Sequence, residues 1–203
     1  MRRLATIAII LWMINPLPAL AETKIYCLGD SLTLGFGVDE AESWPSLVQS
    51  KFDQARPQQV LLINGGINGS SSASGPPRLR FALNTQPDWV ILALGANDGL
   101  RGQDLKAMKK NLAQTIELAQ EAKVKVLLVG MLLPPNYGKA YTDEFAQSYR
   151  DLAKRYQIPM VPFLLEGVAG KTKLNQADGI HPNRDGYRII AKNIFTHLNR
   201  LIQ

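Results

Sequence analysis

Short apolar segments alternate with longer amphipathic ones along most of the chain. Two of the short segments, Val90–Leu94 and Val126–Val129, are continuously apolar, which is typical of strands that are covered on both faces of a sheet. The pattern predicts five strands, at Lys24–Leu28, Gln59–Ile63, Asp88–Leu94, Val124–Val129 and Pro159–Phe163.

The amphipathic segments between these strands place apolar residues three and four positions apart, which predicts helices with one buried face. A final helix is expected over Arg184–Leu201. Because strands and helices alternate with short links, the crossovers should be right-handed and the sheet parallel, between two layers of helices. The predicted fold class is therefore α/β, with a three-layer α/β/α architecture. The apolar positions are Leu105, Met108, Leu112, Ile116 and Ala119 in one helix, Phe145, Tyr149, Leu152 and Tyr156 in the next, and Ile190, Ile194, Leu198 and Leu201 in the last.

Composition excludes several classes of protein. The chain has 203 residues, of which 46% are hydrophobic and 20% charged, so it can bury one core but not two large ones. A single cysteine, Cys27, excludes a disulfide scaffold. The formal net charge is +6, but no basic run is longer than a pair such as Lys109-Lys110, so we expect no nucleic-acid partner.

The N-terminus has the three-part layout of a secretory signal peptide. Arg2-Arg3 precede an apolar stretch from Leu4 to Ile14, and the small-residue site Ala19-Leu20-Ala21 follows. The apolar stretch is shorter than the ~20 residues that span a bilayer, which favours cleavage over an uncleaved anchor. We therefore expect residues 1–21 to be removed after Ala21, leaving 22–203 as a single domain in the periplasm or outside the cell.

Polar residues and glycines follow the predicted strands at the edge where ligands of parallel sheets bind. The segments are Gly29–Thr33 after the first strand, Asn64–Ser70 after the second and Gly95–Asp98 after the third, with Asp178–Pro182 before the last helix. They would bring a hydroxyl, a glycine-rich turn, a carboxamide and an Asp–His pair to one rim.

These groups are suited to acyl transfer. Ser31 can act as nucleophile if a base takes its proton, and His181 is the candidate, since the only other histidine, His197, lies off the apolar face of the last helix. Asp178 can orient the imidazole. The N–H groups of Ser31 and Gly69 and the side-chain amide of Asn97 can stabilise the oxyanion.

Each assignment has an alternative. Ser31 can simply cap a helix, and Asp178 can be a turn residue. Gly65-Gly66 can replace Gly69 as the source of an oxyanion donor. We interpret Asp30 and Asp98 as structural carboxylates that accept hydrogen bonds from loop amides, and the serine run at 70–74 as a mobile polar loop.

Four blocks of the sequence resemble the SGNH (GDSL) hydrolases: Gly-Asp-Ser-Leu at 29–32, Gly69, Gly-x-Asn-Asp at 95–98 and Asp-x-x-His at 178–181. They occur in the family's order. Further segments resemble the bacterial periplasmic branch of acyl-CoA thioesterases, lysophospholipases and arylesterases, namely Trp44-Pro45, Asn97–Gly102, Leu133–Gly138 and Asp178–Asn183.

The resemblance implies a flavodoxin-like five-stranded sheet, a Ser31–His181–Asp178 triad, and an oxyanion hole of Ser31, Gly69 and Asn97. It implies no metal or organic cofactor. Where the family often has an acidic residue after the second-block glycine, this chain has Ser70, and the stretch Ser70–Pro77 is particular to it. Both differences concern substrate preference, and we expect the stretch to border the cleft.

Three functions are compatible with these residues. The first is a serine esterase for acyl esters and thioesters, including lysophospholipids. The second is a carbohydrate O-acetyl esterase, and the third is a non-catalytic flavodoxin-like binding module. The apolar segment Met131–Leu133 favours an acyl chain over a sugar, with Leu133, Pro134, Asn136 and Tyr137 as candidate substrate-binding residues. We expect a monomer that acts on small acyl esters or lipids and touches membrane lipid transiently.

Overall fold

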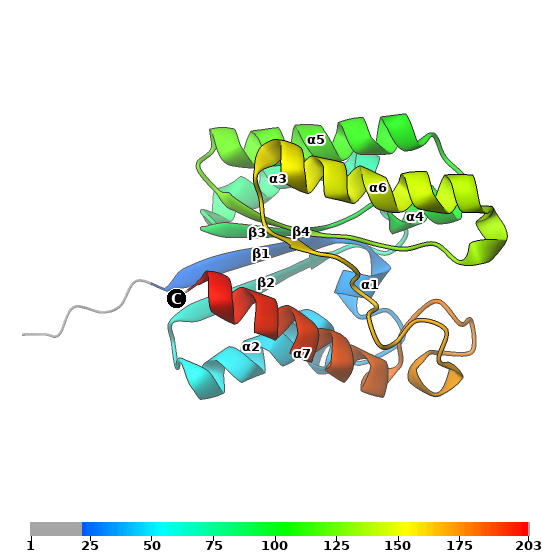
Figure 1. Cartoon of the computed structure of the whole chain (residues 1–203). Coiled ribbons are helices and arrows are strands. Elements are labelled where there is room, and N and C mark those ends of the chain that lie inside the picture. The colour runs from blue at the N-terminus through cyan, green and yellow to red at the C-terminus, as the bar shows by residue number, and fades with distance from the viewer. Residues whose placement is uncertain (1–21, 203) are drawn as a thin grey trace, which may run out of the picture.

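Five parallel strands form the centre of the molecule, in the order β2-β1-β3-β4-β5 (Figure 1). The computed structural model describes residues 22–202, so the predicted signal peptide lies outside the described residues. This strand order is the flavodoxin-like one, and it confirms the predicted fold class. The strands are β1 (Thr23–Gly29), β2 (Val60–Gly66), β3 (Trp89–Ala93), β4 (Lys125–Val129) and β5 (Met160–Val161).

Helices cover both faces of the sheet (Figure 1). One layer consists of α3 (Gly75–Ala82), α4 (Ala96–Leu100), α5 (Leu105–Glu121) and α6 (Lys139–Tyr156). The other consists of α1 (Ser31–Leu34), α2 (Trp44–Ala55) and α7 (Arg184–Leu201). Short 3₁₀ turns lie at Glu40–Glu42, Ser72–Ser74, Leu83–Thr85, Pro135–Tyr137 and Thr172–Leu174. Within residues 22–202, no helix has both the length and the apolar character that crossing a membrane requires.

The core lies between the sheet and each helix layer. All five residues of β3 are buried, as the continuous apolar run predicts for a central strand. Large side chains fill the two interfaces, with Trp44 and Phe52 of α2 on one side and Phe145 and Tyr149 of α6 on the other, each at most 1% exposed.

The fifth strand is shorter than the sequence predicts. Only Met160–Val161 pair with β4, whereas the apolar pattern predicts Pro159–Phe163. Proline has no N–H to donate to a sheet, so Pro159 and Pro162 limit the pairing on this edge strand.

The register brings the ends of three strands to the same level. Gly29, the last residue of β1, lies opposite Gly66 of β2 and opposite Ala93 of β3. The segments that follow these strands therefore begin side by side, at the point where the strand order reverses between β1 and β3. Ligands bind at such a point in doubly wound sheets.

Candidate active site

Ser31 stands at the first position of α1, and only Asp30 separates it from the end of β1. Asp30 caps this short helix, because its Oδ1 accepts a hydrogen bond from Leu32 N–H at 3.0 Å. Helix capping is thus the role of Asp30, and the alternative that Ser31 is the cap is wrong. The Ser31 side chain is 6% exposed and lines a cavity.

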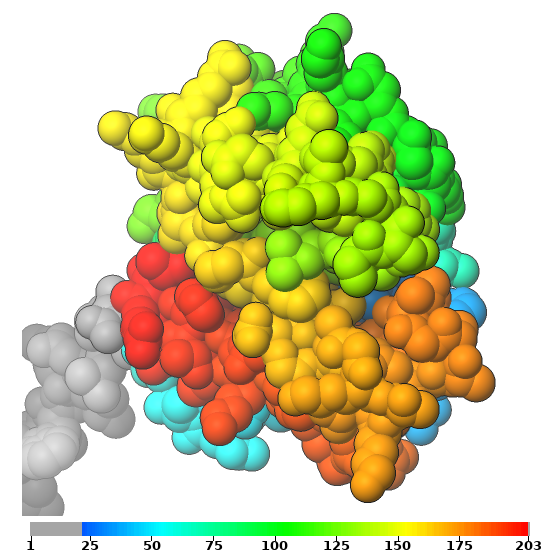
Figure 2. Space-filling view, turned by 45° about the vertical axis from the view of Figure 1, so that its right-hand side comes forward, coloured from blue at the N-terminus to red at the C-terminus, as the bar shows by residue number. Residues whose placement is uncertain are grey.

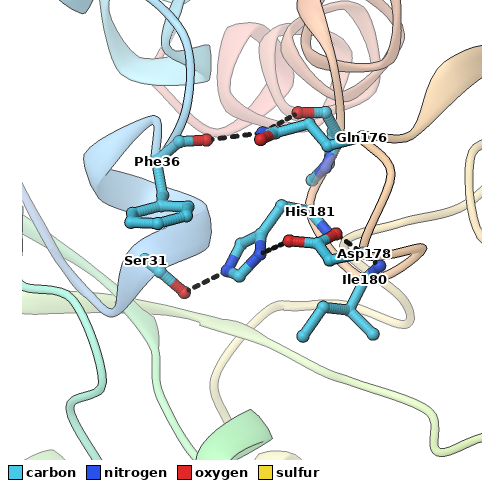
Figure 3. Close-up of polar contacts among 7 residues, drawn as sticks. Ser31, Phe36, Gln176, Asp178, Ile180 and His181 are labelled. Carbon is cyan, nitrogen blue, oxygen red and sulfur yellow. Dashed lines mark hydrogen bonds and ion pairs between the residues drawn. The ribbon is translucent and has the colours of Figure 1, made fainter.

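Ser31, His181 and Asp178 form a continuous hydrogen-bonded series (Figure 3). Ser31 Oγ lies 2.9 Å from His181 Nε2, and His181 Nδ1 lies 2.7 Å from Asp178 Oδ2. The second carboxylate oxygen, Asp178 Oδ1, accepts hydrogen bonds from the N–H groups of Ile180 and His181, both at 3.0 Å. These two backbone hydrogen bonds hold the Asp178–His181 turn together and so fix the distance between the Asp178 carboxylate and the imidazole.

These hydrogen bonds set the charge of Asp178. The backbone N–H of His181, followed by its side chain, lowers the Asp178 pKa to about 2. The carboxylate is thus ionised wherever the protein is near neutral pH. An ionised oxygen beside Nδ1 favours the tautomer that carries its proton on Nδ1 and leaves Nε2 free to accept one from Ser31.

Gly69 and Asn97 line the same cavity as Ser31. Asn97 lies in α4, and its Nδ2 donates to the carbonyl of Ser70 at 3.0 Å. An amide NH₂ carries two hydrogens, so this contact holds the side chain while leaving one donor available. Among the described residues, the N–H groups of Ser31 and Gly69 donate no hydrogen bond.

The alternative donor pair, Gly65-Gly66, occupies a different place. Both residues belong to the end of β2, opposite Leu28 and Gly29, and neither lines the cavity. A Cβ on Gly66 would lie 2.1 Å from the backbone nitrogen of Leu34, so the absence of a side chain there allows β2 to pack against α1.

The cavity has a volume of about 690 Å³ and a largely apolar wall. In the space-filling view, the yellow-green segment after β4 lies above the orange segment that leads to His181 (Figure 2). These segments supply most of the wall, with Met131, Leu132, Leu133, Phe163, Leu165 and Ile180 among its residues. Such a wall suits a hydrocarbon chain.

The four predicted substrate-binding residues divide into two pairs. Leu133 and Pro134 line the cavity, whereas Asn136 and Tyr137 lie outside its lining. The 3₁₀ turn at Pro135–Tyr137 directs Tyr137 toward α4, where its hydroxyl donates to the carbonyl of Leu100 at 2.9 Å.

The serine run at 70–74 contains the 3₁₀ turn Ser72–Ser74 and is anchored through Ser72. Ser72 is fully buried, and its N–H and hydroxyl bind the two oxygens of Asp98 at 2.7 and 2.6 Å. Asp98 is therefore structural, as predicted. The stretch runs into α3, and none of residues 70–77 lines the cavity, but Ser70 directly follows the lining residue Gly69 and its carbonyl accepts a hydrogen bond from the lining residue Asn97.

The family of the chain follows from its similarity to known proteins. The model of the GDSL-like lipase/acylhydrolase family matches residues 27–189. The chain belongs to this family. The match begins just before Ser31 and ends just after His181, so it includes the whole series of hydrogen-bonded side chains.

Three similar proteins show the kind of enzyme. Thioesterase 1/protease 1/lysophospholipase L1 of Escherichia coli (strain K12) is 36% identical over 185 residues, which are 91% of this chain and 87% of that protein. Arylesterase of Vibrio mimicus is 38% identical over 179 residues, 88% of this chain and 89% of that protein. The crystal structure of TesA matches with a TM-score of 0.85 at 35% identity, over 89% of this chain and all of that chain.

As a member of this family, with esterases among its relatives, the chain is an ester hydrolase with the SGNH hydrolase fold. The non-catalytic binding module is therefore excluded. Within residues 22–202, no group of three or more His, Cys, Asp or Glu side chains is arranged to hold a metal ion.

Sequence reasoning missed residues on two sides of this hydrolase site. Phe163 and Leu165 line the cavity after β5, and applying the strand-end rule to the fifth strand would have found them. Phe36 packs its ring 4.7 Å from the His181 imidazole, and Gln176 donates to the carbonyl of Phe36. No periodicity or motif pointed to either contact.

Proposed function

We propose that the protein is an exported serine esterase that hydrolyses carboxylic acyl esters and thioesters through an acyl-enzyme on Ser31. The observation that carries the proposal is the Ser31–His181–Asp178 series, with its 2.9 and 2.7 Å contacts, at the wall of an apolar cavity.

Acylation begins at Ser31. His181 Nε2 takes the hydroxyl proton as Oγ attacks the acyl carbonyl, and Asp178 stabilises the resulting imidazolium. The tetrahedral intermediate then expels the alcohol or thiol, which receives the proton from His181. The products of this half-reaction are the free alcohol or thiol and the acyl ester of Ser31.

The oxyanion of the intermediate requires donors that are already in place. The N–H groups of Ser31 and Gly69 and the second hydrogen of Asn97 Nδ2 supply three from the rim of the cavity. One such donor typically contributes about 3–4 kcal/mol to lowering the barrier.

Deacylation repeats the steps with water. His181 takes a proton from water as its oxygen attacks the acyl carbonyl, and Ser31 Oγ leaves with that proton. The carboxylic acid departs, and the enzyme returns to its starting state.

The cavity wall favours an acyl chain over a sugar, because its side chains are mostly hydrocarbon. Leu132 and Ile180 line the cavity and are also 44% and 46% exposed, so the entrance to the cavity is apolar. A lipid ester, such as a lysophospholipid, presents its acyl chain to such an entrance.

We also propose that residues 1–21 direct export and that the enzyme works as a monomer in the periplasm or outside the cell. The N-terminal charge, apolar stretch and Ala19-Leu20-Ala21 site support this location. Since acyl-CoA is an intracellular metabolite, envelope lysophospholipids or external esters are the natural substrates that fit. Cell fractionation tests the location, and the intact mass of the purified protein tests cleavage after Ala21. An uncleaved protein in the cytoplasm would contradict the proposed export.

The catalytic proposal is tested with the protein purified after expression of the full chain. Nitrophenyl esters from acetyl to palmitoyl are assayed beside a lysophospholipid, an acyl thioester and an acetylated sugar. We expect Ser31→Ala to lower kcat at least about 1000-fold, because the nucleophile is lost while the binding site remains.

Ser50→Ala is the matched control, since its hydroxyl donates within α2 and lies outside the cavity. It should keep wild-type rates. Equal activity of Ser31→Ala and wild type would overturn the mechanism, and activity confined to acetyl groups would favour the carbohydrate O-acetyl esterase.

A further inference from the structure

Two segments far apart in the sequence must meet for the hydrolysis to occur. The Ser31 turn (residues 31–37) carries the nucleophile, and the His181 loop (residues 175–182) carries the base and its carboxylate partner (Figure 3). Neither belongs to a strand of the sheet, so the sheet register alone does not set the distance from Ser31 Oγ to His181 Nε2.

Gln176 joins the two segments with its side-chain amide. Its Nε2 donates to the carbonyl of Phe36 at 2.7 Å, across 140 positions of sequence, and to the carbonyl of Pro182 at 2.9 Å. Its backbone N–H donates to the carbonyl of His181 at 2.8 Å. One residue thus holds two consecutive carbonyls of the His181 loop and one of the Ser31 turn.

These contacts complete a hydrogen-bonded path between the two backbones. Phe36 N–H donates to the carbonyl of Ser31 at 3.0 Å, and the Phe36 carbonyl accepts from Gln176. The path therefore runs from Ser31 through Phe36 and Gln176 to His181. Phe36 also packs its ring 4.7 Å from the imidazole, so displacement of Phe36 would move a neighbour of the base.

Gly37 leaves room for this amide. Its φ is +79°, and a Cβ there would lie 2.1 Å from Gln176 Oε1 and 2.6 Å from Nε2. A side chain at position 37 would push the carboxamide away from the Phe36 carbonyl. The backbone of the Ser31 turn therefore accommodates the Gln176 carboxamide only because residue 37 has no side chain.

We propose that Gln176 is a positioning residue that fixes the separation of Ser31 Oγ and His181 Nε2 by fastening the His181 loop to the Ser31 turn. The inference rests on the proposed serine-esterase mechanism. Gln176 does not itself line the cavity, so we expect its loss to act mainly on the chemical step, with only a small change in substrate binding through the neighbouring lining residue Ile180.

The test compares Gln176→Met with Gln120→Met. Methionine keeps the length of the side chain but donates no hydrogen bond. Gln120 is a matched control, because its Nε2 also donates to a remote backbone carbonyl, that of Tyr156 at 3.1 Å, and it lies outside the cavity. Active sites are counted by the nitrophenol released on complete reaction with a nitrophenyl alkylphosphonate, so that kcat refers to folded, competent protein.

We expect Gln176→Met to lower kcat per site about 10- to 100-fold while KM for a medium-chain nitrophenyl ester stays within about threefold, since small misplacement of reacting groups costs this much. Gln120→Met should change neither. A wild-type kcat in folded Gln176→Met, or a raised KM with unchanged kcat, would overturn the inference. Absence of any esterase activity in the wild type would instead contradict the proposed function on which it rests.

Gly37→Ala provides a second route to the same contact. It keeps Gln176 but displaces its amide, so we expect a kcat loss of similar size at constant KM. If both variants act through the Phe36–Gln176 hydrogen bond, the double variant should be no slower than the slower single one. Multiplied losses in the double variant, or a folded Gly37→Ala protein with wild-type kcat, would contradict the proposal.

Discussion

Two carboxylates near Ser31 and His181 are held in opposite charge states by their surroundings. Asp178 accepts two backbone N–H groups and faces His181, which lowers its pKa to about 2. Asp30 is 2% exposed, and burial raises its pKa to about 6 even though Leu32 N–H opposes the shift. One side chain therefore supplies a permanent negative charge, while the other loses its charge in mild acid.

The raised pKa of Asp30 predicts a pH-dependent stability. In the folded protein Asp30 keeps its proton up to about pH 6, whereas in the unfolded chain it releases it near the ordinary value of 3.8. The contribution of Asp30 to the unfolding free energy is thus fully present below its pKa in the unfolded chain and is lost as pH rises through about 6. Relative to wild type, Asp30→Asn should remove about 2 kcal/mol of the change in unfolding free energy between pH 4 and pH 7.

Urea unfolding at several pH values measures this difference. Asp39→Asn, which changes an exposed carboxylate nearby, should keep the wild-type slope. Parallel pH curves for wild type and Asp30→Asn would show that the folded protein does not shift the titration of Asp30.

At the scale of elements, the site depends on how each strand turns into the next helix. Gly95 makes the turn from β3 into α4, the helix that carries Asn97, with a φ of +108°. A Cβ there would lie 2.3 Å from the hydroxyl of Tyr149, which donates to the carbonyl of Leu94 at 3.0 Å. The absence of a side chain thus allows α6 to pack against the end of β3.

Gly95→Ala should therefore affect both stability and rate. The strained backbone and the contact with Tyr149 are expected to cost at least about 2 kcal/mol of unfolding free energy. Displacement of α4 moves Asn97, so kcat should fall as well. Urea unfolding measures the loss of unfolding free energy, and ester hydrolysis by the same preparation measures kcat.

Gly102→Ala separates backbone strain from packing. Gly102 has a φ of +63°, but a Cβ there would meet nothing within 4 Å. This variant should lose only about 1 kcal/mol and keep its kcat. Equal losses of unfolding free energy in Gly95→Ala and Gly102→Ala would show that the contact with Tyr149 does not add to the cost of Gly95→Ala.

At the scale of the molecule, the cavity is built by segments that follow different strands. Leu132 and Leu133 come after β4, Phe163 and Ala169 after β5, and Ile180 from the loop that carries His181. We therefore expect the preference for acyl-chain length to depend on how these segments pack around Ser31, separately from the Ser31–His181–Asp178 series itself.

Ala169→Phe should change chain-length preference with little effect on chemistry. Ala169 is exposed and lines the cavity, so a larger side chain narrows the space without disturbing the core. We expect the ratio of kcat/KM for octanoyl over acetyl nitrophenyl ester to fall about 10-fold, within the range that hydrophobic pockets reach for small changes in fit.

Ala122→Phe is the matched control, since Ala122 is exposed at the end of α5 before β4 and lies outside the cavity. Its octanoyl-to-acetyl ratio should equal that of wild type. An unchanged ratio in Ala169→Phe would place the acyl chain elsewhere.

The sequence by itself determined the α/β class and the positions of the strands, because burial on both faces leaves continuous apolar runs that can be read locally. It also determined which residues follow each strand, and so placed Ser31, Gly69, Asn97 and His181 at one rim. It failed at the edge strand, where prolines shortened the pairing, and it gave no sign that Ser72 is buried against the carboxylate of Asp98.

Only the tertiary structure decided how the rim is assembled. The contact of Gln176 with Phe36 joins positions 140 apart, and the lining after β5 comes from a segment with little regular structure. Such contacts depend on the conformations of loops and on which carbonyls they bring together. Contacts of this kind leave no periodic pattern in the sequence, because they join single residues that are far apart along the chain.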